Sequence, residues 1–206
     1  AYDLLNKNKF IKNEKYIILL DEMFNNEQYL RLGTYTDKKI IKIHYENLIK
    51  KLKIISKYYK KKVIICIHPS DNLKEKKNIF SDFIVKQYQT KKYIYQSKLI
   101  LFFESSAIID AIILKKKIMT ILSNALDKNQ TDHNMHYVNE IDIPFLNIDE
   151  DLTFDKDTIN KYKYDKKKIN KSYNSYINKY IAPDNSNIQG YVKISNIIKK
   201  NFFLRK

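Results

Sequence analysis

The sequence predicts an α/β protein: an open, Rossmann-like parallel sheet of about five or six strands with helices on both faces. Short and almost wholly apolar segments recur along the chain, and the clearest are residues 16–20, 63–67 and 99–103. Such segments are typical of strands whose two faces are both covered by helices. Amphipathic or apolar segments of helical length separate them, which favours parallel strands joined by crossover helices.

The remaining elements are expected from periodicity and turn chemistry. Further strands are expected over residues 79–85, 117–122 and 145–148. Helices are expected over residues 39–60, 90–97, 105–114, 155–180 and 185–203, with Thr90 as the cap of the second. Residues 71–78 read as a short helix or a loop. Residues 123–140 hold Asn, Asp and His without a clear period and are expected to form a loop.

Length and composition favour one domain. The chain has 206 residues, and we expect residues 1–15 to be a lead-in or linker and residues 16–206 to form a single α/β domain that includes the C-terminal helices. One cysteine, two glycines and three prolines argue against a disulfide-stapled or loop-rich fold. Cys66 lies within an apolar strand and is expected to be a buried thiol, which favours a reducing, cytoplasmic location.

The net charge of +16 has two interpretations. One is a surface for nucleic acid or for an anionic membrane. The other is compositional drift toward lysine, and we favour it because the lysines are spread along the chain and arginine is nearly absent. Peripheral contact with the inner face of a membrane through lysines stays open, and no specific nucleic-acid partner is expected.

Polar clusters directly follow three of the apolar strands. They are Asp21-Glu22, His68-Pro69-Ser70 and Glu104-Ser105-Ser106. Ligands of open parallel sheets bind beyond the carboxyl ends of the strands, so these clusters are expected on one rim. An imidazole, serine hydroxyls one strand away and a helix N-terminus together suit a phosphate-sized anion. The alternatives are that the serines only cap the helix and that His68 only caps a strand end.

Other motifs exclude several classes of site. Neither of the usual glycine-rich phosphate loops is present, which argues against a standard dinucleotide-binding domain and a P-loop NTPase. His133 and His136 lie near Asp132, but a solvated loop is the favoured interpretation and no metal is expected. His44 lies on the predicted helix over residues 39–60 and is expected to be structural.

The order of these motifs resembles the C-terminal, donor-binding half of GT-B glycosyltransferases that build bacterial surface polysaccharides. Within that group, HP followed later by SS is similar to sialyl-, polysialyl- and Kdo-transferases that use CMP-sugars. The matching residues here are His68, Pro69, Ser105 and Ser106, and the resemblance implies that they hold the donor phosphate. The likeness covers roughly residues 16–200, and the segment from Ala182 resembles the closing helix of such proteins.

The resemblance also implies a substrate. It is a nucleotide sugar, with CMP favoured over UDP as the nucleotide, and no further cofactor. Its phosphate would lie near His68, Ser70 and the two serines, and its base near residues 86–90, including Thr90. Glu104 would meet a ribose hydroxyl and Asp110 would orient a serine one turn earlier. Asp21 and His68 are the candidate catalytic residues. His68 would act at the donor phosphate, and Asp21 would act as a base, although its ordinary pKa of about 3.9 is low for that role.

GT-B enzymes work in a cleft between two such domains, so the resemblance implies that this chain is one half. The glycan acceptor and the base would then come from an N-terminal domain, and the isolated chain would turn over little. Two alternatives remain. A nucleotide-sugar 2-epimerase uses the same fold, but it needs more acidic and arginine residues. A basic nucleic-acid-binding domain would use Tyr58, Tyr59 and residues 60–62.

Overall fold

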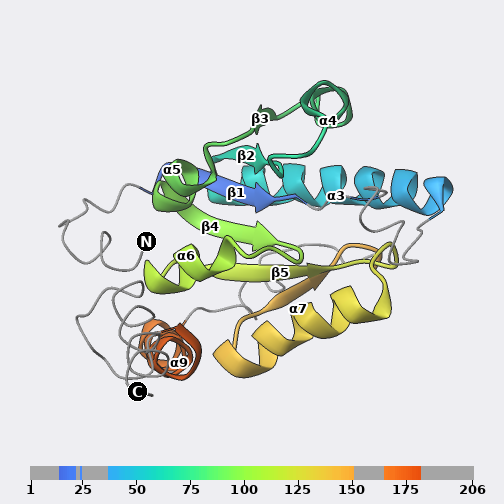
Figure 1. Ribbon diagram of the computed structural model, residues 1–206. Helices are drawn as coiled ribbons and strands as arrows, with labels where there is room; N and C mark the ends of the chain where they lie inside the picture. The colour runs from blue at the N-terminus through green and yellow to red at the C-terminus, as the bar shows by residue number, and fades with distance from the viewer. Residues whose placement is uncertain (1–13, 22–23, 25–36, 151–164, 182–206) are drawn as a thin grey trace, which may run out of the picture.

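A computed structural model describes residues 14–21, 24, 37–150 and 165–181 (Figure 1). Six strands form one sheet in the order β3-β2-β1-β4-β5-β6, and every neighbouring pair is parallel. This is the strand order of a doubly wound Rossmann-type sheet, so the expected fold class is confirmed. The strands are β1 (Tyr16–Leu20), β2 (Lys62–Cys66), β3 (Ile84–Lys86), β4 (Ser97–Phe102), β5 (Ile118–Leu122) and β6 (Phe145–Asn147).

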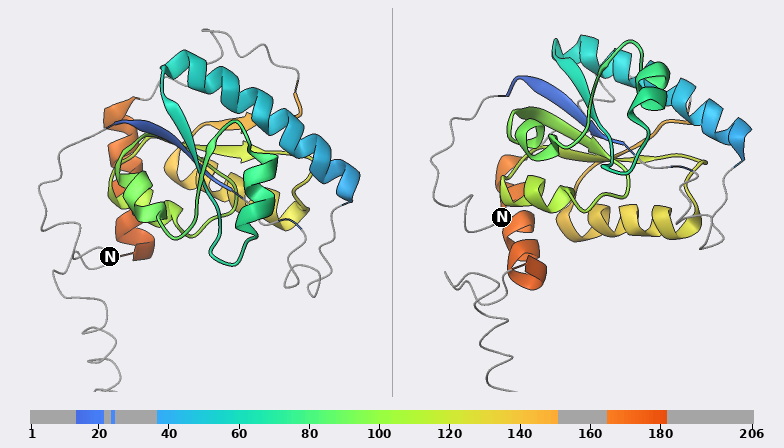
Figure 2. Two further views of the ribbon diagram at one scale, coloured as in Figure 1. Left: turned by 90° about the horizontal axis from the view of Figure 1, so that it is seen from above. Right: turned by 45° about the horizontal axis from the view of Figure 1, so that its top comes forward.

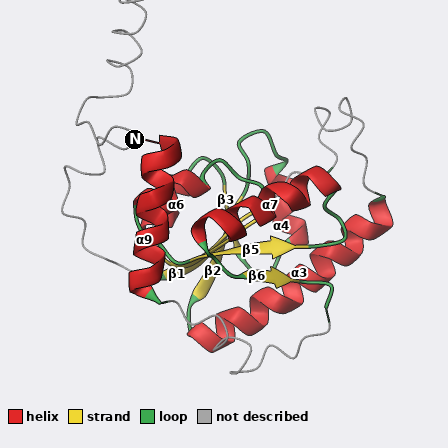
Figure 3. Ribbon diagram, turned by 90° about the horizontal axis from the view of Figure 1, so that it is seen from below, coloured by secondary structure: helices red, strands yellow, loops and turns green. Residues whose placement is uncertain are grey.

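Helices cover both faces of the sheet. Figure 2 shows α3 running alongside β1 on one face, and Figure 3 shows α6, α7 and α9 in front of the strands on the other. The described helices are α3 (Lys38–Tyr59), α4 (Leu73–Ile79), α5 (Thr90–Tyr95), α6 (Ile108–Ile113), α7 (Lys128–Ile141), α9 (Lys166–Tyr176) and the π-helical turn η1 (Ile177–Ile181). None of them is long and apolar enough to span a membrane.

Successive side chains of each strand point to opposite faces of the sheet and pack into two apolar layers. Ile17 and Leu19 of β1 join the layer under α3, whereas Ile18 and Leu20 join the layer under α5, α6, α7 and α9. The inner strands therefore carry apolar residues on both faces, because neither face meets water.

The helix α3 is anchored by an apolar stripe and by caps at both ends. Leu48, Leu52 and Ile55 recur at helical spacing and are buried against the sheet. The Asp37 side chain accepts a hydrogen bond from the backbone N–H of Lys39 at 2.6 Å, and Lys60 ends the helix in the left-handed region.

Two expectations about the bounds of local structure are wrong. Residues 123–140 are not a loop, because α7 starts at Lys128 with a capping box between Asp127 and Gln130. The strand expected over 79–85 is shorter and later, since α4 occupies its first residue and β3 begins at Ile84.

The expected threonine cap is wrong as well, and the alternative in which a serine side chain caps the helix after β4 is not seen. The helix after β4 begins at Ile108 with Ala107 as its N-cap, and no side chain caps it. Gln89 rather than Thr90 is the N-cap of α5, again without a side-chain bond. Three predicted segments lie partly or wholly outside the described residues: residues 1–13 of the lead-in over 1–15, the first part of the helix over 155–180, and the helix over 185–203.

Candidate functional site

The candidate site lies at the carboxyl ends of β1 to β4. The chain passes from β1 to β2 to β3 on one side and then returns to place β4 on the other side of β1. The helix that follows β1 (α3) and the helix that follows β4 (α6) lie on opposite faces of the sheet, and such a switch point is where doubly wound sheets bind their ligands. The described residues of the polar clusters expected on this rim do follow the ends of β1, β2 and β4, and Glu22 lies outside the described residues.

The loop after β2 presents an exposed imidazole. The Nδ1 of His68 accepts a hydrogen bond from the backbone N–H of Ser70 at 3.1 Å. In the neutral ring the proton therefore sits on Nε2, which is left as the donor toward a ligand. His68, Pro69 and Ser70 are all exposed, so a phosphate group could reach this loop from solvent.

A glutamine that sequence reasoning missed holds this loop in place. The side-chain Nε2 of Gln87, just after β3, donates to the carbonyl oxygens of His68, Pro69 and Asp71 at 3.2, 3.0 and 2.9 Å. Next to it, the hydroxyl of Tyr88 donates to the carbonyl of Pro69 at 3.0 Å. The loop conformation is therefore fixed from the neighbouring strand end.

Under the rim lies a buried charge cluster around Lys76 of α4. Its Nζ lies 2.5 Å from Oδ2 of Asp21, 2.5 Å from the hydroxyl of Tyr45 and 3.2 Å from Oδ2 of Asp71. The side chains of Lys76 and Asp21 are 6% and 0% exposed. The cluster ties the end of β1 to α3, α4 and the loop after β2.

Electrostatics inside the cluster favour the charged lysine and the neutral tyrosine. Burial alone lowers the pKa of Lys76, but Asp21, Tyr45 and Asp71 outweigh it and raise the pKa above its usual range. Burial and the Asp21 carboxylate raise the pKa of Tyr45. The Asp21 carboxylate, predicted as a candidate base, is thus buried and paired with Lys76, which suits it to holding the rim together rather than to taking a proton from an acceptor.

The loop after β4 carries Glu104, Ser105 and Ser106. Ser106 is exposed, and Ser105 and Glu104 are partly buried. One carboxylate oxygen of Glu104 lies 3.0 Å from Nδ1 of His133 on α7, the helix that the sequence analysis missed. The carbonyl oxygens of Ser105 and Ser106 accept the backbone N–H groups of Ile108 and Ile109 at 3.2 and 3.3 Å. The N-cap of α6 is Ala107, and no side-chain hydrogen bond caps this helix.

Two further predicted residues lie near this loop on α5 and α6. Thr90 opens α5 and is partly buried. Asp110 on α6 lies 3.9 Å from Nζ of Lys91, an ion pair between α6 and α5. The expected role of Asp110 toward a serine stays a prediction.

One geometric expectation needs correction. The serines were expected one strand away from His68, but β1 lies between β2 and β4. With neighbouring strands about 4.8 Å apart, the two loops are separated by about 10 Å at the sheet. Together they can contact a group that extends across the end of β1, such as a nucleotide, more readily than one small anion.

A second buried polar pair lies beyond β5. Nδ1 of His44, on α3, lies 2.8 Å from Oγ of Ser123, and the imidazole is packed among Phe24, Tyr45 and Phe103. Burial lowers the pKa of His44 to about 3. His44 is therefore neutral at physiological pH, and its packing among aromatic rings agrees with the structural role expected for it.

Metal and thiol chemistry find little support in the described part of the chain. It holds no group of three or more His, Cys, Asp or Glu side chains that could bind a metal ion. Cys66 ends β2 as a buried free thiol, and burial raises its pKa to about 12. Such a thiol is a core residue and not a nucleophile.

Comparison with solved structures identifies proteins of similar fold. No protein-family model matches the chain, and neither does any curated protein. The chain does share its fold with the wall teichoic acid polymerase TagF, with a TM-score of 0.52, 15% identity, and coverage of 98% of this chain and 51% of TagF. The GT-B-like fold that the motifs implied is thereby confirmed, and the chain spans about half the length of TagF.

Two weaker likenesses involve proteins solved with UDP. The UDP-GlcNAc 2-epimerase of Methanocaldococcus jannaschii gives a TM-score of 0.47 at 16% identity, with coverage of 97% of this chain and 51% of the epimerase. TarM of S. aureus also gives 0.47 at 16% identity, with coverage of 85% and 34%. TM-scores below 0.5 support no argument about site or substrate.

Proposed function

We propose that this chain is the donor-binding half of a glycosyltransferase that builds a surface polysaccharide or lipooligosaccharide. The observation that carries the proposal is the placing of His68, Ser105 and Ser106 on loops at the switch point of a 3-2-1-4-5-6 sheet. The GT-B-like fold supports it, and so does the exposure of His68 and Ser106 at the rim.

The donor is a nucleotide sugar, and we propose CMP as its nucleotide on the strength of the HP and SS motifs. The Nε2–H of His68 donates to a phosphate oxygen, while the Ser70 N–H keeps the ring in place through Nδ1. Ser105 and Ser106 approach from the other side of β1 and donate their hydroxyls. These donors stabilise the negative charge that develops on the leaving phosphate as the sugar bond breaks.

We propose that deprotonation of the acceptor takes place on a second domain. Asp21, the acidic residue at the end of β1, is held in a buried ion pair with Lys76, which supports a base from outside the described residues. The half-length match to TagF supports a two-part enzyme. The glycan acceptor would bind between the parts, and the lysine-rich outer face of α3 would allow contact with the anionic inner face of a membrane.

Calorimetry tests the proposal. CMP, UDP and GDP are titrated into the purified chain and into a variant that combines His68→Ala with Ser106→Ala. A matched control combines His136→Ala with Ser175→Ala, which removes the same two side-chain types from exposed positions on α7 and α9. We expect wild type and control to bind CMP and the rim variant to bind it at least about tenfold more weakly, since it loses two hydrogen bonds to a charged group. Equal binding by the rim variant, or no binding by wild type, contradicts the proposal.

A further inference from the structure

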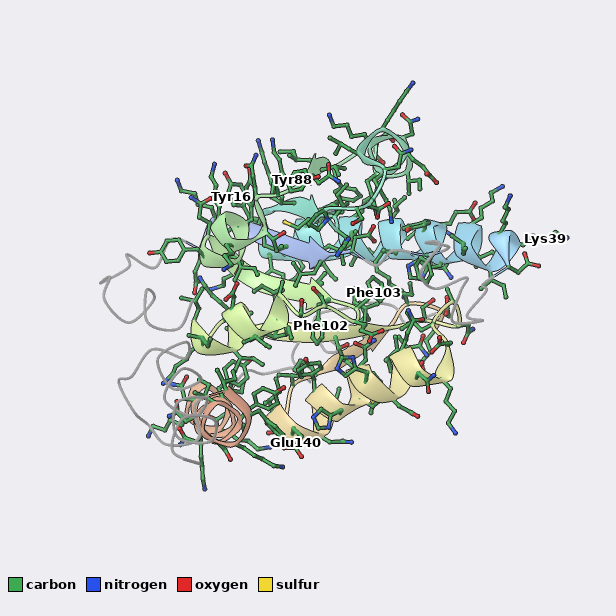
Figure 4. The ribbon with its side chains drawn as sticks, in the orientation of Figure 1. Tyr16, Lys39, Tyr88, Phe102, Phe103 and Glu140 are labelled. Carbon is green, nitrogen blue, oxygen red and sulfur yellow. The ribbon has the colours of Figure 1, made fainter. Side chains whose placement is uncertain are left out.

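Tyr88 is the most exposed large apolar side chain in the described part of the chain. It is 76% exposed, whereas every other exposed side chain of this class is 53% exposed or less. Figure 4 separates Tyr88, beside β3, from Phe102 and Phe103, which lie between the layers of the fold. No packing within the described residues accounts for a ring held in water at this position.

The backbone of Tyr88 is strained as well. Its φ is 62°, in the left-handed region that bulky residues rarely occupy. The other described residues with positive φ are Lys60, Lys115 and Asp142, and each of them ends a helix, where this conformation is routine. Tyr88 ends no helix. Strain of this kind persists where the surroundings enforce it, and it concentrates at ligand sites.

The surroundings that enforce it belong to the candidate site. The Tyr88 hydroxyl donates to the carbonyl of Pro69 at 3.0 Å, and the adjacent Gln87 holds the same loop. The ladder between β2 and β3 continues up to this point, because the N–H of Ile67 donates to the carbonyl of Lys86 at 3.0 Å. Tyr88 and His68 therefore follow neighbouring strand ends, on segments that are hydrogen-bonded to each other.

We infer that Tyr88 is a preformed stacking surface for the base of the nucleotide bound at this rim. The inference rests on the proposed function, because the phosphate subsite at His68 sets where the base lies. The exposed Tyr88 ring offers a π-face to a base, and its hydrogen bond to Pro69 lowers the entropy cost of ordering it. Stacking uses the π-face that every base has, so Tyr88 supplies affinity without selecting one base.

Ligand truncation combined with mutation tests the inference. CMP and ribose 5-phosphate, which lacks the base, are titrated calorimetrically into the full chain, Tyr88→Ala and Tyr88→Phe. We expect Tyr88→Ala to weaken CMP by about 5- to 150-fold, the range for loss of one stacked base, and to leave ribose 5-phosphate within about twofold. Tyr88→Phe keeps the ring and loses only the bond to Pro69, so it weakens CMP less than Tyr88→Ala does.

Two controls keep the test decisive. Tyr58→Ala removes another exposed tyrosine, 39% exposed at the end of α3, and should leave both ligands unchanged. Tyr88→Asn removes the ring with a residue that tolerates positive φ, and it replaces Tyr88→Ala if that variant does not fold.

Each remaining outcome decides a separate point. Unchanged CMP affinity in the ring-less variants overturns the role of Tyr88 and leaves the proposed function standing. An equal loss for CMP and ribose 5-phosphate also overturns it, because Tyr88 then acts only on the loop. If wild type binds neither ligand, the proposed function fails and this inference fails with it.

Discussion

Removing the charge of Lys76 should destabilise the protein far more than removing the charge of a surface lysine. Its Nζ contacts two carboxylates and a phenol, and both Lys76 and Asp21 are almost fully out of water. Lys76→Met keeps the length of the side chain and leaves Asp21 as a buried charge without its main partner, which costs about 3–5 kcal/mol. For a chain of this size that is a fall in Tm of about 6–20 °C.

The matched control is Lys53→Met. The Lys53–Asp82 pair is nearly as short, at 2.6 Å, but its side chains are 56% and 55% exposed. An exposed pair contributes about 0–1 kcal/mol, so this variant should melt within a few degrees of wild type. Thermal unfolding followed by circular dichroism measures both. The reasoning is refuted if Lys76→Met and Lys53→Met shift Tm equally.

A double variant tests the cause. Asp21→Asn combined with Lys76→Met leaves no uncompensated charge at the pair, so it should be more stable than the sum of the two single changes allows. Strict additivity would show that the loss comes from packing and not from the buried carboxylate.

Three other predictions concern separate parts of the molecule. Burial lowers the pKa of His44 to about 3 in the folded state, so its contribution to stability is present above its unfolded pKa of about 6.5 and is lost as pH falls toward 3. In urea titrations the free energy of unfolding should fall by about 1.4 kcal/mol per pH unit in that range, and His44→Phe should remove this slope. Asn134 is fully buried, and neither polar atom of its amide has a hydrogen-bond partner within the described residues, so Asn134→Leu should leave stability unchanged or raise it by about 1–3 kcal/mol in urea unfolding, and a loss above 1 kcal/mol would contradict this. Gln87→Ala removes the side chain that holds the loop after β2, so it should speed amide hydrogen exchange at Ser70 and Asp71 and weaken CMP binding. Gln89→Ala removes an exposed glutamine and should do neither; equal exchange rates in the two variants would show that Gln87 does not hold the loop.

The pH dependence at the alkaline end should come from the Lys76 cluster. The pKa values of Lys76 and Tyr45 are both raised in the folded state. Their stabilising contribution is therefore fully present below their unfolded values of about 10 and is lost as pH rises above them. Urea unfolding should give a constant free energy between pH 8 and about 9.5 and a decline beyond, which Lys76→Met reduces. A flat profile to pH 11 would contradict the assignment.

The sheet could be predicted from sequence because its signal is local. Residues 16–20 are apolar at every position but the first, and they form β1 with the expected bounds. Residues 99–103 mark β4 for the same reason, although the strand starts at Ser97. A strand covered on both faces needs apolar residues throughout, and such a segment can be recognised without knowing its neighbours.

The helix α7 was missed although the signals were present. Its first turn holds a capping box, Asp127 with Gln130, and its buried face includes Tyr137 and Ile141, four residues apart. The polar residues between them, including the fully buried Asn134, masked the helical period. The capping box alone would have identified the start of the helix.

The rim was predictable, but its internal partners were not. The position of His68 follows from topology, since a residue that ends a parallel strand lies on the ligand-binding edge. Lys76 pairs with Asp21, a residue 55 positions away. Nothing in the sequence distinguishes this buried lysine from the other basic residues, 39 in all. Likewise, the positive φ of Tyr88 could not be predicted from the sequence, because the residues around it include no glycine or asparagine to indicate a left-handed conformation.

The sheet is bounded on each side by a strand of only three residues, β3 and β6. The four strands between them are apolar segments of the kind that stack into fibrils when their edges are open. Two short edge strands offer few unpaired amide and carbonyl groups to another molecule, which disfavours edge-to-edge association of this sheet. Among the described residues, Ile84–Lys86 and Phe145–Asn147 are therefore the segments where a longer strand would expose more of these groups.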